Sequence, residues 1–360
     1  MIKVLVAIFT WALTQVALCH PLSTIIKPRY GINQVATQGV CGIFFGRRDS
    51  VLCNPANLSM NSEEGLVFSL VTKTDGDSVE AGQDVLFSPI DKEFLEELFE
   101  LNSFNSWEAG SMLEFQTPFF YLSYEPVYAQ AAFFIFNPAS PEISLTTSKQ
   151  RRINLTLSED LKYGDHNFHF GLNTFYYERD YFSGSFSLFE LSGASVDELI
   201  DLKASSAINA DLGVIYRNNG VRWIPSFSFV YKNIGSKHEV DSARLDDEKA
   251  LEPILLYETY LKAEFGYDFN MDYGSLAAAI GMYTDKGIGT YYSDYTTLSL
   301  GYSLWNFELL GSYSLYTQTA GIKFSSDSNS VGIVYGRTKA LGDFLDDHED
   351  FAIVNLEIYL

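Results

Sequence analysis

The residue types that most often do chemistry are sparse in this chain, and they do not converge on one site. The five histidines are His20, His166, His169, His238 and His348. His166 and His169 flank Asn167, and some membrane-embedded acyl hydrolases combine Ser, His and Asn on barrel strands. A polar His169 facing the interior of a barrel is the favoured interpretation. No phosphate-binding, dinucleotide-binding or nucleophile-elbow motif is present, so we expect no catalytic residue, no metal site and no cofactor.

The acidic residues form two dense clusters and give the chain a net charge of −22. This charge excludes binding to nucleic acid through its phosphates. Divalent cations near lipopolysaccharide are one interpretation of the clusters, but neither has the spacing of an EF-hand loop. Solvated loops are the favoured interpretation. The clusters are Glu239, Asp241, Asp246, Asp247, Glu248 and Glu252, and Asp343, Asp346, Asp347, Glu349 and Asp350.

The N-terminus predicts export. Residues 1–19 contain Lys3, an apolar run and then small residues at Ala17 and Cys19, the layout of a cleavable secretory signal. Lipidation at Cys19 and a retained membrane anchor are less favoured, because Leu18 is bulky and the apolar run falls short of the ~20 residues that span a bilayer. We therefore expect export, and the strand pattern described below makes a bacterial outer membrane the expected destination.

Two cysteines remain in the mature chain, Cys41 and Cys53. An oxidising compartment favours a disulfide between them. The alternative is a pair of buried free thiols.

Side chains alternate between apolar and polar over many short segments, which is the period that a β-strand imposes. In residues 260–270, for example, Leu261, Ala263 and Phe265 alternate with Lys262 and Glu264. The last residues alternate in the same way, and the chain ends on Leu360. The predicted strands are 64–72, 111–124, 127–136, 143–158, 167–173, 208–217, 221–232, 260–270, 274–286, 297–304, 306–315, 318–325, 330–338 and 351–360.

These segments predict an all-β protein, a transmembrane antiparallel barrel of about fourteen strands. Aromatic residues make up 15% of the chain, in agreement with the aromatic girdles of such barrels. The predicted connections alternate between short turns and long loops, an asymmetry known from outer-membrane barrels. Short helical patterns at 88–101 and 195–202 predict helices in two of the long loops. We expect residues 1–19 to be a signal peptide, residues 20–63 a plug and residues 64–360 the barrel.

Polar residues on the second face of these strands are the candidate functional residues. We expect them to face the lumen, where charges of both signs can pair, because a charge facing lipid at the midplane costs a few kcal/mol. They are Glu114, His169, Asp211, Arg217, Arg222, Lys232, Lys262, Glu264, Asp268 and Glu308.

The segment around Asn54, Pro55 and Ala56 resembles the Asn-Pro-Ala motif of FadL-type outer-membrane transporters and of PorV-like and TraF-like barrels. A second echo is the stretch Ala210–Tyr216 followed by Lys232-Asn233-Ile234-Gly235, which is similar to paired strands ending in a KNxG turn. The resemblance implies a fourteen-stranded barrel with an N-terminal plug.

We expect a passive channel for a small, possibly hydrophobic solute, with membrane lipid and lipopolysaccharide around it. The alternative is a structural or secretion-partner barrel that docks an envelope protein through the long loops 73–110 and 233–254.

Overall fold

The computed structural model describes residues 35–40, 42, 50–61, 64–75, 105–136, 142–187, 203–235, 260–271, 273–283, 296–315, 317–339 and 348–360. Residues 1–19, Cys41 and the two predicted loop helices lie outside these ranges. The signal peptide and the loop helices therefore stay predictions. None of the described helices is long and apolar enough to cross a membrane.

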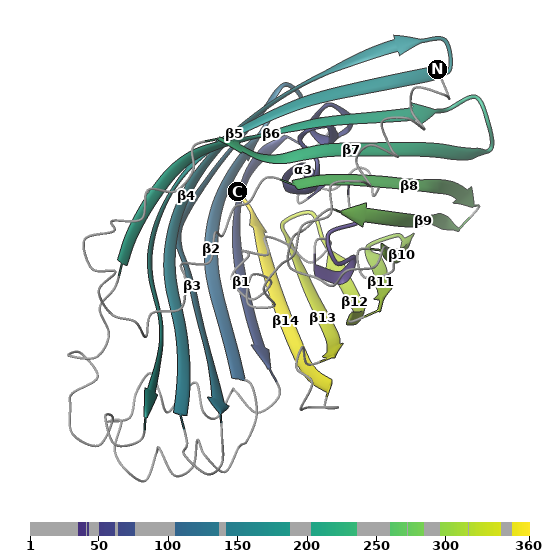
Figure 1. Ribbon diagram of the computed structural model, residues 1–360. Helices are drawn as coiled ribbons and strands as arrows, with labels where there is room; N and C mark the ends of the chain where they lie inside the picture. The colour runs from purple at the N-terminus through teal and green to yellow at the C-terminus, as the bar shows by residue number, and fades with distance from the viewer. Residues whose placement is uncertain are drawn as a thin grey trace.

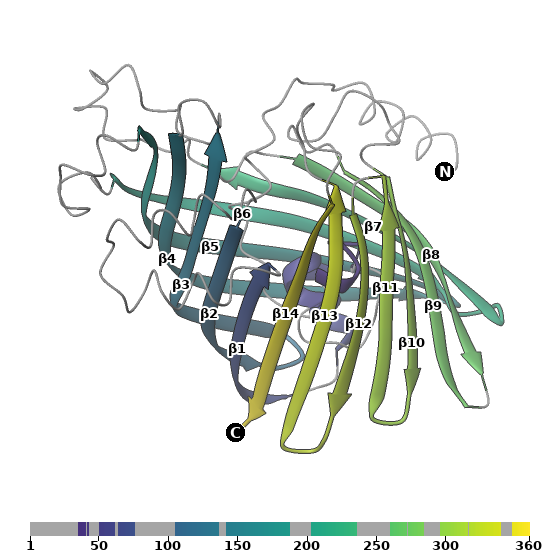
Figure 2. The same ribbon diagram turned by 90° about the horizontal axis from the view of Figure 1, so that it is seen from below.

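Fourteen antiparallel strands form a closed ring, in which each strand pairs with its neighbours in sequence and β14 returns to pair with β1 (Figures 1 and 2). The predicted fold and strand number are confirmed. The strands are β1 Gly65–Asp75, β2 Asn105–Gln116, β3 Phe120–Phe136, β4 Glu142–Tyr163, β5 His166–Ser187, β6 Lys203–Asn218, β7 Trp223–Gly235, β8 Tyr260–Met271, β9 Gly274–Tyr283, β10 Thr296–Leu304, β11 Phe307–Ser314, β12 Thr317–Ser325, β13 Asn329–Lys339 and β14 His348–Tyr359.

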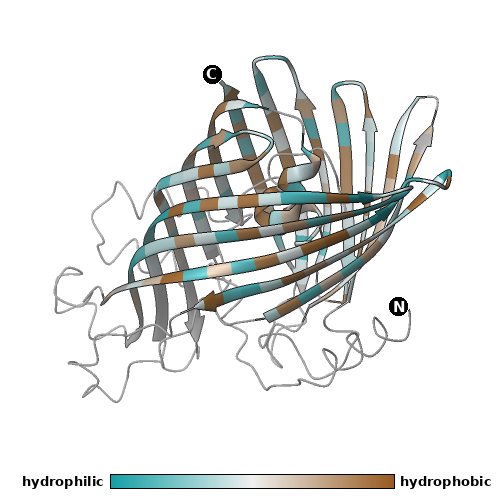
Figure 3. Cartoon of the chain, turned by 90° about the horizontal axis from the view of Figure 1, so that it is seen from above, coloured by the Kyte–Doolittle hydropathy of each residue, from teal (hydrophilic) through white to brown (hydrophobic). Residues whose placement is uncertain are grey.

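The side chains are distributed inside out relative to a soluble protein. Along β4, the outward residues Ile153, Leu155 and Leu157 are exposed, whereas Arg152 and Asn154 between them are buried. The alternation recurs along the other strands (Figure 3). A closed ring leaves no unpaired backbone edge, and an apolar outer surface is favourable in hydrocarbon. The protein is therefore built as a transmembrane β-barrel.

Aromatic residues mark the end of the barrel where adjacent strands are joined by short turns, here called the short-turn end. Five of these turns, or the residues beside them, carry an aromatic side chain that is at least 61% exposed. Amphipathic rings favour the boundary between hydrocarbon and water. The five residues are Phe119, Tyr163, Trp223, Tyr273 and Trp305.

The predicted break between the strands 111–124 and 127–136 is wrong, because Glu125 and Pro126 lie inside β3. The pairing of β3 shifts here on both sides, between Ser111 and Leu113 of β2 and between Glu125 and Tyr128 of β3. Such a bulge accommodates a residue that cannot donate to the ladder, as proline cannot. The turn before β3 is at residues 117–119 instead, and β2 ends at Gln116.

Strands β4 and β5 are much longer than predicted, at 22 residues each. A tilted strand needs only about 9–11 residues to cross a bilayer. Beyond Ile153 and Tyr176, on the side away from the short-turn end, the outward residues become charged. Here Arg151 lies 4.0 Å from Glu178. These strands therefore continue beyond the apolar band towards the long connections.

Candidate functional site

The barrel interior is occupied by an N-terminal stretch of the same chain. Residues 35–40, 42 and 50–61, here called the inner segment, include α3 (Ser50–Cys53) and the 3-10 helix η2 (Pro55–Met60). Both views place α3 within the ring of strands (Figures 1 and 2). Most of the segment is buried, and Ala36, Val40 and Leu58 have no exposed surface. Its placement against the wall is therefore the central feature of the interior.

The first part of the inner segment is held by hydroxyl groups of β10 and β12. Ser299 Oγ donates to the carbonyl oxygen of Thr37 at 3.1 Å, and Thr319 Oγ1 donates to that of Ala36 at 2.7 Å. Gln38 Nε2 donates to the carbonyl oxygen of Thr317 at 2.7 Å. These bonds satisfy backbone groups that would otherwise be buried without partners.

The Asn54-Pro55-Ala56 motif starts η2. Asn54 is its N-cap, with the side-chain oxygen accepting from the amide of Ala56 at 3.0 Å, and Pro55 occupies the first turn, where no amide is needed. The side-chain amide of Asn54 also donates to Ser228 Oγ of β7 at 2.9 Å. One residue thus caps the helix and binds it to the wall.

Two glycines of the wall make room for this motif. Gly171 of β5 and Gly213 of β6 are partners in the strand register. A Cβ atom added at Gly171 would overlap the backbone of Pro55, and one added at Gly213 would overlap the side-chain oxygen of Asn54. The pair is here called the glycine notch. It lets the inner segment approach the backbone of the wall.

The second sequence echo forms a bulge rather than a turn. The register of β6 against β7 shifts between Ala210 and Leu212, and Asn233 has a positive φ of 59° inside β7. The carboxylate of Asp211 accepts from the amide of Asn233 at 2.9 Å and from Lys232 Nζ at 3.1 Å. Lys232 also donates to the carbonyl oxygen of Leu52 at 2.7 Å. The motif therefore binds the inner segment.

A second lysine makes the same kind of contact. Lys262 of β8 donates to the carbonyl oxygen of Gly39 and lies 2.6 Å from Glu264 on the same strand. The side chains of Lys262 and Glu264 are 6% and 0% exposed. Gly42 of the inner segment packs directly against Glu264, since a Cβ atom there would lie 2.7 Å from its carboxylate.

The other residues predicted to face the lumen occupy several parts of the wall. Glu114 accepts from Ser69 at 2.7 Å and from Tyr121 at 2.9 Å. His169 Nδ1 lies 2.8 Å from Ser59 Oγ of the inner segment.

Two of the remaining four are paired with each other, since Arg217 lies 3.1 Å from Asp268. Glu308 accepts from Ser303 at 3.3 Å. Arg222 differs from the rest, because it lies in the turn before β7 and is exposed.

The inner segment meets the β2–β3 side of the barrel through apolar contacts. Val51, Leu52 and Leu58 form one buried cluster with Met112, Tyr121 and Tyr128. A second cluster joins the first part of the segment to β9, β11, β13 and β14. The polar contacts to β5–β8 and the apolar cluster at β2–β3 therefore lie on different parts of the wall.

Several interior residues form a chain of contacts across the junction of β14 and β1, which the sequence does not single out. Lys73 lies 3.6 Å from Glu108 and 5.3 Å above the ring of Phe351. Glu108 accepts from Tyr128 at 2.5 Å. The Tyr128 ring lies over Gly110, its register partner. These contacts connect four adjacent strands.

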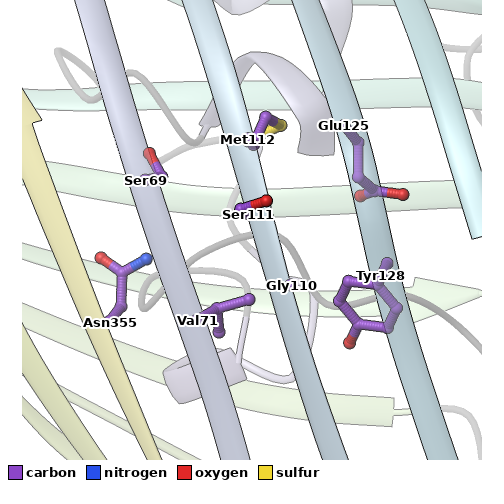
Figure 4. A pocket seen from close by; sticks show the side chains of 8 residues that line it. All are labelled: Ser69, Val71, Gly110, Ser111, Met112, Glu125, Tyr128 and Asn355. Carbon is purple, nitrogen blue, oxygen red and sulfur yellow. The ribbon is translucent and has the colours of Figure 1, made fainter.

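A small pocket lies on the same four strands, next to the bulge in β3 (Figure 4). Asn355 of β14 is at one edge and Tyr128 of β3 at the other, with Val71 and Met112 between them. Its lining mixes apolar and polar groups. It is the part of the β2–β3 side where the wall is least regular.

The described residues contain neither a metal site nor both members of a cysteine pair. Among the described residues, no group of three His, Cys, Asp or Glu side chains could hold a metal ion. Cys53 is in a disulfide, while Cys41 lies outside the described residues, so the pairing of the two stays a prediction.

No family model matches the sequence, and no curated protein matches it. Solved structures that match the fold over most of the chain include two toluene transporters and a FadL homologue. The toluene transporter TodX of Pseudomonas putida is 11% identical, with 93% of this chain and 99% of that chain covered and a TM-score of 0.48.

Two further structures are similar over comparable lengths. The toluene transporter TbuX of Ralstonia pickettii is 8% identical, with coverage of 96% and 99% and a TM-score of 0.45. A FadL homologue of Pseudomonas aeruginosa is 11% identical, with coverage of 92% and 98% and a TM-score of 0.45.

Proposed function

We propose that the protein is a non-enzymatic channel of the bacterial outer membrane, which passes a small hydrophobic solute around its inner segment. The observation that carries the proposal is a closed, outwardly apolar barrel whose interior holds a separate stretch of chain. That stretch is joined to the barrel by side-chain contacts from many strands. We propose that it acts as a plug.

The apolar cluster favours a hydrophobic solute. A solute that separates Leu58 from Tyr121 replaces one apolar contact with another. A polar solute would have to bury its hydrogen-bonding groups there at a cost of about 1–3 kcal/mol each. The charges of the wall also favour an uncharged cargo, because each of Lys232, Lys262 and Arg217 has a carboxylate beside it.

Uptake by vesicles tests the proposal, with lipopolysaccharide as the outer leaflet because toluene crosses a phospholipid bilayer without a protein. The full mature chain and a variant lacking residues 20–63 are reconstituted, and entry of toluene is compared with liposome swelling in a small sugar. We expect the full chain to admit toluene and to exclude the sugar, and we expect the deletion variant to admit both. Protein-free liposomes give the background rate. Equal toluene entry with and without either protein would refute the channel.

A docking function through the long connections remains the second candidate from the sequence. Those connections lie mostly outside the described residues, and no contact in the structure favours it.

A further inference from the structure

The wall of β6–β8 binds the inner segment in a way that the rest of the barrel does not repeat in the contacts described above. Lys232 and Lys262 each donate to a backbone carbonyl oxygen of the segment, at Leu52 and Gly39. Each lysine is also paired with a carboxylate of the wall, Asp211 or Glu264. We propose that the two lysines are latches, which hold the inner segment against β6–β8 while the solute passes on the apolar side.

The chemistry of the latches makes them the strong contacts. A hydrogen bond to a charged donor is roughly twice as strong as one between neutral groups, and the effect is larger in a dry interior. The side chains of Lys232 and Lys262 are only 11% and 6% exposed, so water competes poorly for them. Breaking either bond leaves a buried ammonium group with one partner fewer.

The positions of the two lysines also suit them to hold the inner segment. Gly39 and Leu52 lie on either side of the stretch from residue 41 to residue 51, so the two lysines hold the inner segment at two separate points. Asn54 adds a third contact on the same wall through Ser228, and the glycine notch brings that contact close. By contrast, the cluster at Met112, Tyr121 and Tyr128 is made by apolar packing.

The inference rests on the proposed function for its meaning, but its test does not need transport. Hydrogen–deuterium exchange is measured on the full mature chain in liposomes, comparing amides of residues 35–40 and 50–61 with those of β10–β13. In the double variant Lys232→Met and Lys262→Met, exchange of the inner segment should rise by at least about tenfold. Exchange of the strand amides should stay unchanged. Methionine keeps the length of the side chain and removes the donor.

Three further variants make the result decisive. Lys323→Met removes another buried wall lysine, which pairs with Glu357 at 3.0 Å, and should leave the ratio of the two exchange rates as in the wild type. Lys232→Arg with Lys262→Arg keeps both donors and should restore most of the protection. If the double methionine variant does not fold, adding Asp211→Asn and Glu264→Gln removes the stranded carboxylates and supplies the test.

Two results would overturn the latches. One is unchanged exchange of the inner segment in the methionine variants, and the other is an equal rise in the strands, which would make the lysines general stabilisers of the barrel. Toluene entry is measured for the same proteins in the vesicles with lipopolysaccharide as the outer leaflet. If neither the wild type nor the double methionine variant admits toluene, but exchange rises selectively in the inner segment of the variant, the latches are supported and the channel is refuted.

Discussion

Two glycines determine how closely the Asn54-Pro55-Ala56 turn approaches the wall. Gly171 and Gly213 face each other across β5 and β6, and the turn fills the space that two Cβ atoms would need. The motif and the notch are therefore complementary. Asn54 is needed because it caps the helix and bonds to Ser228, and the glycines are needed because they have no Cβ atom.

Filling the notch should displace the turn. We expect Gly213→Ala to destabilise the folded barrel by about 1–3 kcal/mol, because the added methyl group overlaps the side chain of Asn54 and overpacks a buried site. The measurement is the urea midpoint of the heat-modifiable band on a gel. Gly311→Ala is the matched control, since a Cβ atom there would lie 3.3 Å from the carbonyl oxygen of Thr319. Equal midpoints for the two variants would contradict the notch.

For individual residues, the sequence predicts which face of a strand a side chain occupies better than it predicts what that side chain contacts. On β8, Lys262, Glu264 and Asp268 are recognisable as inward residues because the alternation around them is regular. Arg222 fits the same alternation but precedes the first residue of β7. The alternation alone does not tell where a strand begins. The bond from Asn54 to Ser228 joins residues 174 apart, and no local pattern carries that information.

Among the elements, β3 shows how one extra residue is accommodated. Inward residues fall on odd positions up to Glu125 and on even positions from Tyr128 onwards. The bulge at Pro126 and Val127 therefore reconciles two halves that would otherwise present opposite faces to the lumen. Periodicity analysis splits such a strand into two, since a proline between two alternating runs has the same pattern as a turn.

Removing the extra residue should leave the faces of β3 intact. Deletion of Val127 places Glu125 and Tyr128 two positions apart, so both stay inward and the ladders to β2 and β4 become regular. We expect this variant to give a folded, heat-modifiable barrel. Deletion of Ala129 is the contrast, because it puts Tyr128 and Gln130 on opposite faces of the strand and should prevent folding. Equal folding of the two variants would contradict this account of the bulge.

The outer face of β10 offers a test of the membrane-facing surface. Leu300 points outward and is 58% exposed. We expect Leu300→Arg to lower the free energy of folding into lipid vesicles by about 2–4 kcal/mol, as charged residues do near the midplane. Lys149→Ala on the upper part of β4, where outward residues are charged, should change it little. Equal effects would place the apolar band elsewhere.

For the molecule as a whole, closure depends on the first and last strands. β1 and β14 pair from Val67 with Tyr359 to Asp75 with Phe351. The contacts from Phe351 through Lys73 and Glu108 to Tyr128 cross this junction on the inner side. The ring, rather than any single sheet, is therefore the unit of stability.

A cross-link tests the ring directly. Leu70 and Leu356 are register partners on the outer face, so Leu70→Cys with Leu356→Cys should form a disulfide on oxidation in the membrane. The joined ends give a band of altered mobility on a non-reducing gel. Leu70→Cys with Ile333→Cys, on β13, is the control and should not form the bond. Failure of the first pair to react would mean that the ring is open.

The sequence predicts the architecture of the whole molecule well. Fourteen alternating segments without a spanning helix leave a closed barrel as the structure that satisfies the hydrogen bonds of its backbone in lipid. It also predicts that residues 20–63 are a plug, but it does not predict which wall residues hold the inner segment. The inner segment has no strand period, and its place depends on partners scattered over β1 to β14.

The pairing of β1 with β14 also sets the order of events during biogenesis. Synthesis makes β1 first and β14 last of the fourteen strands, so one edge of β1 has no partner until β14 is made. Until then the polypeptide has an unpaired strand edge and an apolar outer surface while it is still in water. A nascent chain cut short before residue 348 can never seal, which makes it a substrate for proteases and a burden on the chaperones that escort it.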